Sequence, residues 1–541
     1  MARGCTLGAV RGGTKISVAN IGLATQKGKR QTTKQEKQEY TWRDKKQKNG
    51  LKEKTAKEIW RKKKGAERHM ETVETKPKAK GAWAHIREYF ANFKVLKECP
   101  PRYWGVQAIN LLHCFAYFAF LNIATMFLGV DMGLSHENVG YFYGAFGVVS
   151  GVCLIFVSGP VTDRFGVRVS MGISIIGKVL SGLAIIGVLM SGMGKSLVGL
   201  CILALSLIVM GIGNAVVKTG FQVANRRFST KRSEAAAFNV WYLVMNVGAA
   251  LGAYSIDKLV PDKSMSFLPI IVLYAIVNLL ALVPLFLMRS EAPVRAEDVK
   301  KKEEESFVEI FISVIKEVKF WKLTTLVTLY VPVQMAFIYI SAISPDYWKN
   351  VMGNKAPQGM FQAINPIIIF TGLILIIPLL EKMNIVTMLV VGAIVSSCSM
   401  MVLSLPWQWF GATVYQGVYW LTIISMAVLA FGELTWSPKL NQITAQMAPE
   451  NRIASYLGIS SSTFFLAKMA AGALSGHMIE RWCPEGIGEK MASGNLAFAD
   501  SPGFMWLILG LMALSGPIIT FFLRGWLFSD LRKKPQEEAA S

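Results

Sequence analysis

Residues 159–168 read GPVTDRFGVR and separate two apolar runs, 138–160 and 168–191. The hydrocarbon core of a bilayer is about 30 Å thick, so a helix of about 20 apolar residues crosses it. Each of the two runs is long enough for one such helix. The stretch therefore predicts a membrane protein in which a short charged loop joins two neighbouring spans.

Further apolar runs of similar length follow along the whole chain from residue 104 onward. Their length and composition predict an all-α membrane protein with twelve transmembrane helices. We place these spans at 104–130, 138–160, 168–191, 197–224, 236–256, 267–288, 322–344, 359–380, 385–405, 412–436, 453–476 and 503–526.

The composition agrees with this class and excludes others. Of the 541 residues, 52 % are hydrophobic and 17 % are charged, and the mean hydropathy is +0.38. Residues 1–100 carry a net charge of +16 and the other 441 residues only +7 of the total of +23, so nucleic acid is not expected as a partner. The seven cysteines lack the spacing of a disulfide framework or a metal site, and we predict no metal and no other cofactor.

The N-terminal segments and the loops predict the topology. Residues 1–82 are rich in Lys and poor in aliphatic residues, which indicates a disordered basic tail. Residues 83–103 have apolar residues at helical spacing, which indicates an amphipathic helix at the membrane surface. Most Lys and Arg of the loops fall on the side of the tail, so we expect both termini in the cytoplasm, with the protein in the plasma or inner membrane. Anionic lipids are expected to attract the tail.

A long polar stretch, 289–321, divides the spans into six and six and predicts a cytoplasmic linker. It separates an N-terminal half, 104–288, from a C-terminal half, 322–526, which a short cytoplasmic tail, 527–541, follows.

The two halves share short motifs at equivalent places. The loop after span two reads P-x-x-D-R-x-G over 160–166, and the loop after span eight reads P-x-x-E-K-x-N over 378–384. Span five contains Gly248-x-x-x-Gly252, and span eleven contains Gly472-x-x-x-Gly476. Small residues four apart allow two helices to approach closely. Their paired placement predicts two pseudo-symmetric six-helix units.

The stretch 159–168 resembles the loop signature G-x-x-x-D-R-x-G-x-R of the major facilitator superfamily, and it lies in the second loop as that signature does. The resemblance implies the major facilitator fold and a gating role for Asp163, Arg164 and Arg168, whose ion pairs would open and close as the protein changes state. We expect the same role for Glu381 and Lys382 at the equivalent place. The alternative for the arginines is topological anchoring alone.

Within that superfamily, most of 100–526 resembles the proton-dependent oligopeptide transporter branch. Residues 211–218, GIGNAVVK, are similar to that family's G-x-G-N-x-x-x-K-P, with Thr219 at the place of the proline. Residues 238–248, FNVWYLVMNVG, resemble its fifth span, and Gly432-Glu433 resembles its tenth. The resemblance implies that Lys218 binds a peptide carboxylate and that Glu433 faces a peptide amine.

The first span departs from this family. Aligning 115–119, FAYFA, with the family's F-x-Y-Y-G puts Cys114 where an arginine is expected and His113 where a glutamate is expected. The chain thus lacks the E-x-x-E-R element, whose acids take part in proton coupling in the family. The departure leaves open whether the solute is a peptide or a different organic molecule.

Ionisable residues inside the spans are candidates for function, because each costs at least about 2.5–3.5 kcal/mol at mid-bilayer. Lys218 and Glu433 lie in equivalent spans, where an ion pair or a shared solute would neutralise both, and Glu433 is the predicted proton carrier. Lys468 either faces the same cavity or extends to the outer interface. His113 either replaces a lost acid or packs as a hydrogen-bonded core residue. Lys178 has no predicted role. Neutral candidates for solute contact or helix packing are Tyr117, Asn246, Gln334, Asn365 and Trp436.

These features predict a secondary active transporter that moves a small polar solute, peptide-like or other, together with protons by alternating access. The segment Gly194-Lys195-Ser196 lacks the upstream glycine of a P-loop, so ATP is not expected to drive transport. The alternatives are a transport-inactive sensor and a membrane-embedded enzyme on the same fold. Loss of the first-span acids favours the sensor, and no HExxH or paired-carboxylate motif supports an enzyme.

Overall fold

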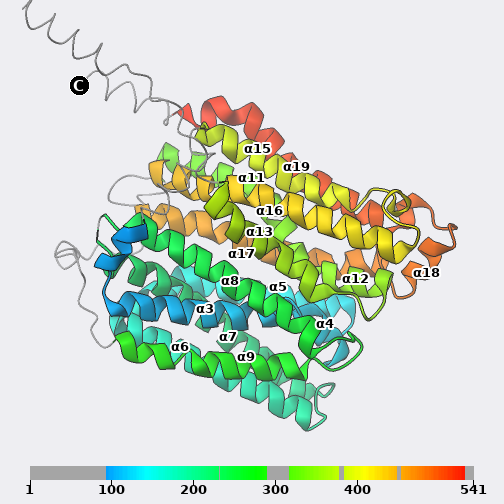
Figure 1. Ribbon diagram of the computed structural model, residues 1–541, viewed down its shortest axis with the longest axis horizontal. Helices are drawn as coiled ribbons and strands as arrows, with labels where there is room; N and C mark the ends of the chain where they lie inside the picture. The colour runs from blue at the N-terminus through cyan, green and yellow to red at the C-terminus, as the bar shows by residue number, and fades with distance from the viewer. Residues whose placement is uncertain (1–92, 231, 289–315, 377–382, 448–452, 530–541) are drawn as a thin grey trace, which may run out of the picture. The chain divides into compact units, whose positions relative to one another are not determined.

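The computed structural model describes residues 93–230, 232–288, 316–376, 383–447 and 453–529. Within these residues the chain is helical and has no strand. Helices α3 to α9 form the N-terminal half, and helices α11 to α19 lie beside them as the C-terminal half (Figure 1). The N-terminal tail 1–82, residues 289–315 of the predicted linker, residues 530–541 of the C-terminal tail, Glu381 and Lys382 lie outside the described residues, as does 83–92 of the predicted surface helix. Residues Phe93–Glu98 of that predicted helix form a 3₁₀ helix, η1, and residues 318–321 of the predicted linker belong to α11.

Among its described residues, the N-terminal half contains seven α-helices and a final 3₁₀ turn. Their bounds are Pro101–Leu121 (α3), Ala124–Val130 (α4), His136–Phe156 (α5), Ser158–Met190 (α6), Leu197–Arg227 (α7), Glu234–Leu259 (α8), Leu268–Leu280 (α9) and Val283–Met288 (η2).

The C-terminal half contains eight α-helices among its described residues. Their bounds are Val318–Ala342 (α11), Ser344–Met352 (α12), Gln358–Leu375 (α13), Ile385–Val402 (α15), Val414–Met447 (α16), Ile453–Trp482 (α17), Ile487–Ala492 (α18) and Pro502–Leu527 (α19). Short 3₁₀ turns at Trp407–Trp409 (η4) and Phe498–Asp500 (η5) precede α16 and α19.

Eleven helices of the described residues are long and apolar enough to cross a membrane. Each corresponds to one predicted span. The remaining predicted span, 453–476, falls within the 30-residue helix α17, where the side chains of 453–463 are not described. The all-α membrane fold is therefore confirmed.

Two spans differ from prediction at their ends. The first predicted span, 104–130, is broken after α3, and the carbonyl oxygen of Asn122 at the break accepts hydrogen bonds from Gln358 and Gln362 of the C-terminal half. The predicted loop 160–168 is a kink inside α6 at Gly166, whose φ of 77° is a conformation that glycine adopts without strain. At both breaks, the backbone groups that leave the helical hydrogen-bond pattern lie in a turn or bond to another residue.

Helix packing repeats between the halves. In the N-terminal half, α6 packs on α7 and α9, α3 packs on α8 and α9, and α5 packs on α7. In the C-terminal half, α15 packs on α16 and α19, α11 packs on α17 and α19, and α13 packs on α16. Matching α3, α5, α6, α7, α8 and α9 with α11, α13, α15, α16, α17 and α19 reproduces every one of these contacts. The halves meet along α5 with α17 and along α8 with α13, which this matching also exchanges.

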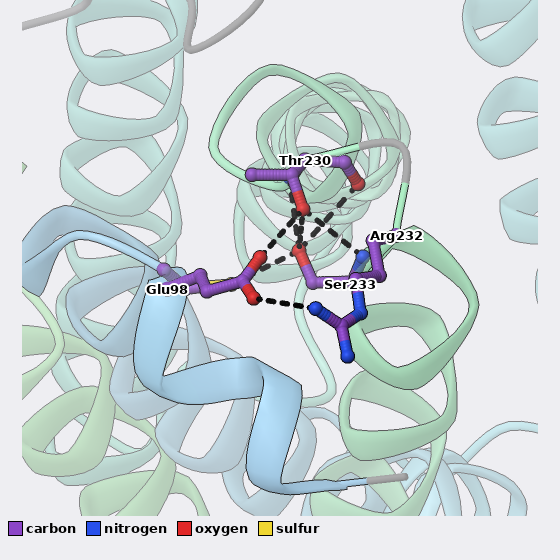
Figure 2. Close-up of polar contacts among 5 residues, drawn as sticks. Glu98, Thr230, Arg232 and Ser233 are labelled. Carbon is purple, nitrogen blue, oxygen red and sulfur yellow. Dashed lines mark hydrogen bonds and ion pairs between the residues drawn. The ribbon is translucent and has the colours of Figure 1, made fainter.

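The two ends of the bundle differ in charge. We call the end where α3 begins and α7 finishes the basic end, because Arg226, Arg227 and Lys322 lie there. At this end the carboxylate of Glu98 in η1 accepts a hydrogen bond from Thr230 Oγ1 at 3.2 Å and lies 3.7 Å from the Arg232 guanidinium (Figure 2). These contacts join η1 to the turn between α7 and α8. Helices α4, α12 and α18 lie at the opposite end (Figure 1).

Glycines set the spacing of α5 and α17. A Cβ added at Gly472 would lie 2.6 Å from the Cα of Gly144, and one added at Gly140 would lie 3.2 Å from the backbone nitrogen of Gly476. The other predicted pair, Gly248 and Gly252, instead packs on the α3 backbone within the N-terminal half. The two GxxxG motifs thus act in equivalent helices but against different partners.

Gly472→Ala is expected to lower the free energy of unfolding by about 1–3 kcal/mol, because the added methyl group meets backbone that cannot move aside as a side chain would. Gly187→Ala is the matched control: it also lies inside a long helix, and nothing approaches its added Cβ within 4 Å. We expect the control to change the free energy by less than about 1 kcal/mol. Denaturant unfolding of the two variants in detergent measures the difference, and equal effects would contradict the glycine-dependent contact.

Candidate functional site

Glu433 lies inside α16, where it is the one carboxylate in the middle of the spans that the structure describes. The side chain of Asn365 on α13 donates a hydrogen bond to Glu433 Oε2 at 3.1 Å. The hydroxyl of Tyr242 on α8 donates to Glu433 Oε1 at 3.5 Å. Asn365 and Tyr242 belong to opposite halves. The carboxylate therefore joins the halves through two neutral donors.

Lys468 on α17 also joins the halves. Its ammonium group donates a hydrogen bond to the hydroxyl of Tyr117 on α3 at 2.7 Å. It lies 5.4 Å from the ring centre of Tyr117, 5.6 Å from that of Phe146 and 5.2 Å from that of Phe464. Only 1 % of the lysine is exposed. Of the two predicted positions for Lys468, the structure thus shows the interior one and not the outer interface.

Lys218 on α7 faces aromatic rings of the opposite half. Its ammonium nitrogen lies 5.7 Å from the ring centre of Phe464 and 5.6 Å from that of Phe465, both on α17. Within the described chain, Lys218 and Glu433 form no ion pair with each other: the lysine faces these rings, and the carboxylate accepts from Asn365 and Tyr242. A solute shared by the two groups stays a prediction.

A buried pair that the sequence analysis did not predict links α3 and α6. Lys178 Nζ lies 2.6 Å from His113 Nδ1, and the two residues are 1 % and 7 % exposed. An ammonium group has only donors, so His113 Nδ1 accepts and the imidazole is uncharged. The His113 ring stacks on Tyr117 at 5.9 Å between centroids. Contacts therefore run from Lys178 through His113 and Tyr117 to Lys468.

The feature that could have identified this pair is that His113 and Lys178 lie at the same depth in the bundle. His113 follows the start of α3 at Pro101 by twelve residues, and Lys178 follows the kink at Gly166 by twelve. At 1.5 Å per residue, both lie about 18 Å from the basic end. Two polar residues at one depth on helices of one half can meet in its interior.

The neutral candidates fall in different places. The Asn246 amide donates to the Tyr242 carbonyl on its own helix at 2.8 Å and so lies one turn from the donor to Glu433. Trp436 Nε1 donates to Ser396 at 3.1 Å within the C-terminal half, and its ring packs on Tyr330 and Phe337. Gln334 is buried on α11. The geometry thus places Asn246 one turn from Tyr242 and packs the Trp436 ring within the C-terminal half.

The predicted gating residues are only partly described. Arg164 is exposed and lies over the Phe165 ring at 5.7 Å, and Arg168 is half-buried at the start of the second part of α6. The side chain of Asp163 is not described, and neither are Glu381 and Lys382. Their gating role stays a prediction.

Polar contacts hold the two halves together at the end opposite the basic end. The hydroxyl groups of Ser341 on α11 and Tyr143 on α5 form a hydrogen bond at 2.7 Å, in which either group can be the donor. The carbonyl oxygen of Ser341 accepts a hydrogen bond from the Thr125 hydroxyl. Asp257 on α8 accepts from the backbone nitrogen of Met360 at 2.8 Å. Together with Gln358 and Asn122, these groups close the bundle at that end.

A buried acid at the same end makes stability depend on pH. Burial raises the pKa of Asp346 on α12 above its ordinary value of 3.8, although His136, Lys349 and the Thr125 hydroxyl oppose the rise. Between the unfolded and the folded pKa, the folded state holds more protons, so the free energy of unfolding falls as pH rises through this window and is highest below it. Asp346→Asn should flatten this slope in unfolding midpoints measured from about pH 4 upward. An unchanged slope would assign the dependence to another group.

The sequence pattern of the Major Facilitator Superfamily matches residues 108–473, which is more than half of the chain. The chain belongs to the major facilitator superfamily. Comparison with curated protein sequences finds no match. The resemblance to the superfamily drawn from 159–168 is thereby confirmed.

Solved structures of the oligopeptide transporter branch share the fold of this superfamily member. A POT family transporter in complex with 5-aminolevulinic acid is 16 % identical, with a TM-score of 0.60, over 80 % of this chain and 99 % of that one. The peptide transporter POT in complex with sulfate is 15 % identical, with a TM-score of 0.59, over 81 % and 98 %. A bacterial homologue of the human drug peptide transporters is 16 % identical, with a TM-score of 0.60, over 80 % and 99 %. At these identities the likeness shows the fold.

Proposed function

We propose that this protein is a secondary active transporter that moves a small polar solute across a membrane by alternating access and couples this movement to protons. The observation that carries the proposal is the place of Glu433. It is the one described carboxylate in the middle of the spans, and donors from both halves, Tyr242 and Asn365, hold it. A carboxylate at this position can bind a proton, and its hydrogen bonds depend on how the two halves are placed relative to each other.

The closed end supports alternating access. Contacts through Ser341, Asp257 and the Gly472–Gly144 crossing hold the halves together away from the basic end. We assign the basic end to the cytoplasm, because Lys and Arg gather on that side of membrane proteins. Both termini are then cytoplasmic, and the described conformation is closed toward the outside. Rocking of the halves about the centre would open it.

A peptide-like solute is the first class to test. The solved structures of similar fold include transporters in complex with 5-aminolevulinic acid and with a thioalcohol-conjugated peptide. Lys218 and Glu433 occupy the places at which this branch's fourth-span lysine and tenth-span glutamate are expected.

One observation favours a transport-inactive sensor as the second candidate. At the places of the missing first-span acid and arginine, His113 accepts from Lys178, and the Cys114 thiol donates to Asn110 at 3.4 Å. These groups satisfy each other inside the N-terminal half and leave none of the family's first-span acids to carry protons.

Uptake into proteoliposomes decides between the two. The purified protein is reconstituted, and accumulation of radiolabelled di- and tripeptides, amino acids and nitrate is followed with an inward proton gradient and without one. A transporter accumulates at least one solute above protein-free liposomes only when the gradient is present. A sensor shows neither accumulation nor counterflow of any solute, and that outcome would overturn the proposal.

A further inference from the structure

Two lysines from opposite halves each contact the same aromatic ring, that of Phe464. Lys218 of the N-terminal half and Lys468 of the C-terminal half lie 5.7 and 5.2 Å from the ring centre of Phe464. Their other described partners are neutral as well: Phe465 for Lys218, and Tyr117 and Phe146 for Lys468. Two like charges therefore converge with no carboxylate among these partners.

The charge of the interior has the same sign. In the middle of the described spans, Lys178, Lys218 and Lys468 stand against the single carboxylate of Glu433. His113 adds no charge, because it accepts from Lys178. The ion pairs of the described chain, such as Lys263 with Asp257, lie at the ends of the helices and leave this excess in place. The interior thus carries a net charge of about +2 with all four groups ionised.

Resting on the proposed transport function, we propose that the solute carries a net negative charge and that its anionic group binds between the ammonium groups of Lys218 and Lys468, beside the Phe464 ring. A net-neutral zwitterion would leave the net charge of the interior unchanged, because its own cation offsets the charge that its anionic group compensates. An anion compensates both charges, and Lys468 is buried in the interior, where an uncompensated charge is costly. Tyr117 adds a donor, because its oxygen accepts from Lys468 and its own proton stays available.

The same geometry makes the anion a link between the halves. Lys218 lies on α7 and Lys468 on α17, so one anionic group that contacts both draws the two halves together at the centre of the bundle. Carboxylates and phosphate monoesters both provide oxygens that accept from two ammonium groups. The experiment therefore includes both.

The test uses the full-length protein in proteoliposomes and compares solutes of matched size. Counterflow at pH 7.5 is competed with the dipeptides Ala-Ala, Asp-Ala and Lys-Ala, with succinate, and with glycerol 3-phosphate. We expect at least one anionic competitor to act at a concentration at least about tenfold lower than Ala-Ala, and Lys-Ala to be the weakest. The carboxylate and phosphate arms identify which anion the site takes.

Substitutions of the two lysines test whether this site causes the preference for anionic competitors. Lys218→Met and Lys468→Met are each expected to reduce it at least about tenfold, whereas Lys218→Arg and Lys468→Arg keep the charge and much of the preference. Lys258→Met is the matched control, since Lys258 also faces an aromatic ring, that of Tyr254, but is exposed at the far end of α8. Where a methionine variant does not purify as a single species, the corresponding Lys→Gln variant gives the same test.

The outcomes separate this inference from the proposed function. Anion preference that both lysine variants lose supports the site. Counterflow of Ala-Ala with equal or weaker competition by every anion overturns the inference and leaves the transport function standing. Anion preference that survives both substitutions overturns the assignment to Lys218 and Lys468. Absence of counterflow with every solute overturns both.

Discussion

Glu433→Gln is expected to reduce proton-driven accumulation to the level of protein-free liposomes while leaving solute counterflow in place. Glutamine has nearly the same shape: its carbonyl oxygen can accept from Asn365 while its amide NH2 donates to the Tyr242 hydroxyl oxygen, but it cannot take up a proton. The variant therefore separates proton binding from the packing of the halves. Counterflow needs only that the loaded protein changes state, so it should continue.

The controls for this variant distinguish coupling from folding. Glu480→Gln makes the same chemical change on the exposed side of α17, near its end, and should keep full proton-driven uptake. Asn365→Ala removes one donor but keeps the carboxylate, so we expect weakened but measurable accumulation. Full accumulation by Glu433→Gln would remove this residue from the coupling mechanism. Loss of counterflow as well would show that the carboxylate binds solute directly.

The sequence predicts the architecture well because membrane burial acts on long, simple patterns. Each apolar run has the length that a bilayer demands, and the break at 289–321 divides the runs evenly. The kink at Gly166 and the break at Asn122 were not predicted. Asn122 lies inside an otherwise apolar stretch, and its partner, Gln358, is more than 200 residues away. Gly166 lies inside the charged stretch 159–168, where a loop was predicted and the structure has a kink within one helix.

Partners of the interior charges were harder to predict than the charges themselves. Lys218, Lys468 and Glu433 stand out because ionised groups are rare in spans. Pairing Lys218 with Glu433 follows from opposite charge, yet the structure gives both residues neutral partners from other helices. Such partners, a phenol, an amide and phenyl rings, are common in any span, so composition does not mark them. The sequence shows Lys178 as a charge inside a span. Predicting its acceptor, His113, would have required knowing that α3 and α6 bring these two residues together at the same depth.

His113→Leu is expected to be the most destabilising single change at this pair, lowering the free energy of unfolding by about 3 kcal/mol or more. It removes the described acceptor of Lys178, which is 1 % exposed, and leaves an amine buried without compensation. Lys178→Met leaves only a neutral imidazole nitrogen unpaired, so its cost should be smaller, about 1–2 kcal/mol.

The double variant provides the decisive comparison, because it removes both polar groups and leaves neither unsatisfied. Adding Lys178→Met to His113→Leu should therefore recover part of the lost stability, although each substitution alone is harmful. Denaturant unfolding of the three variants and the parent protein in detergent gives the coupling free energy. If the two losses simply add, the 2.6 Å contact contributes nothing to stability, and His113 is free to serve another group. Recovery would instead fix His113 as the acceptor of Lys178, which separates it from the proton-carrying role that its place in the first span suggested.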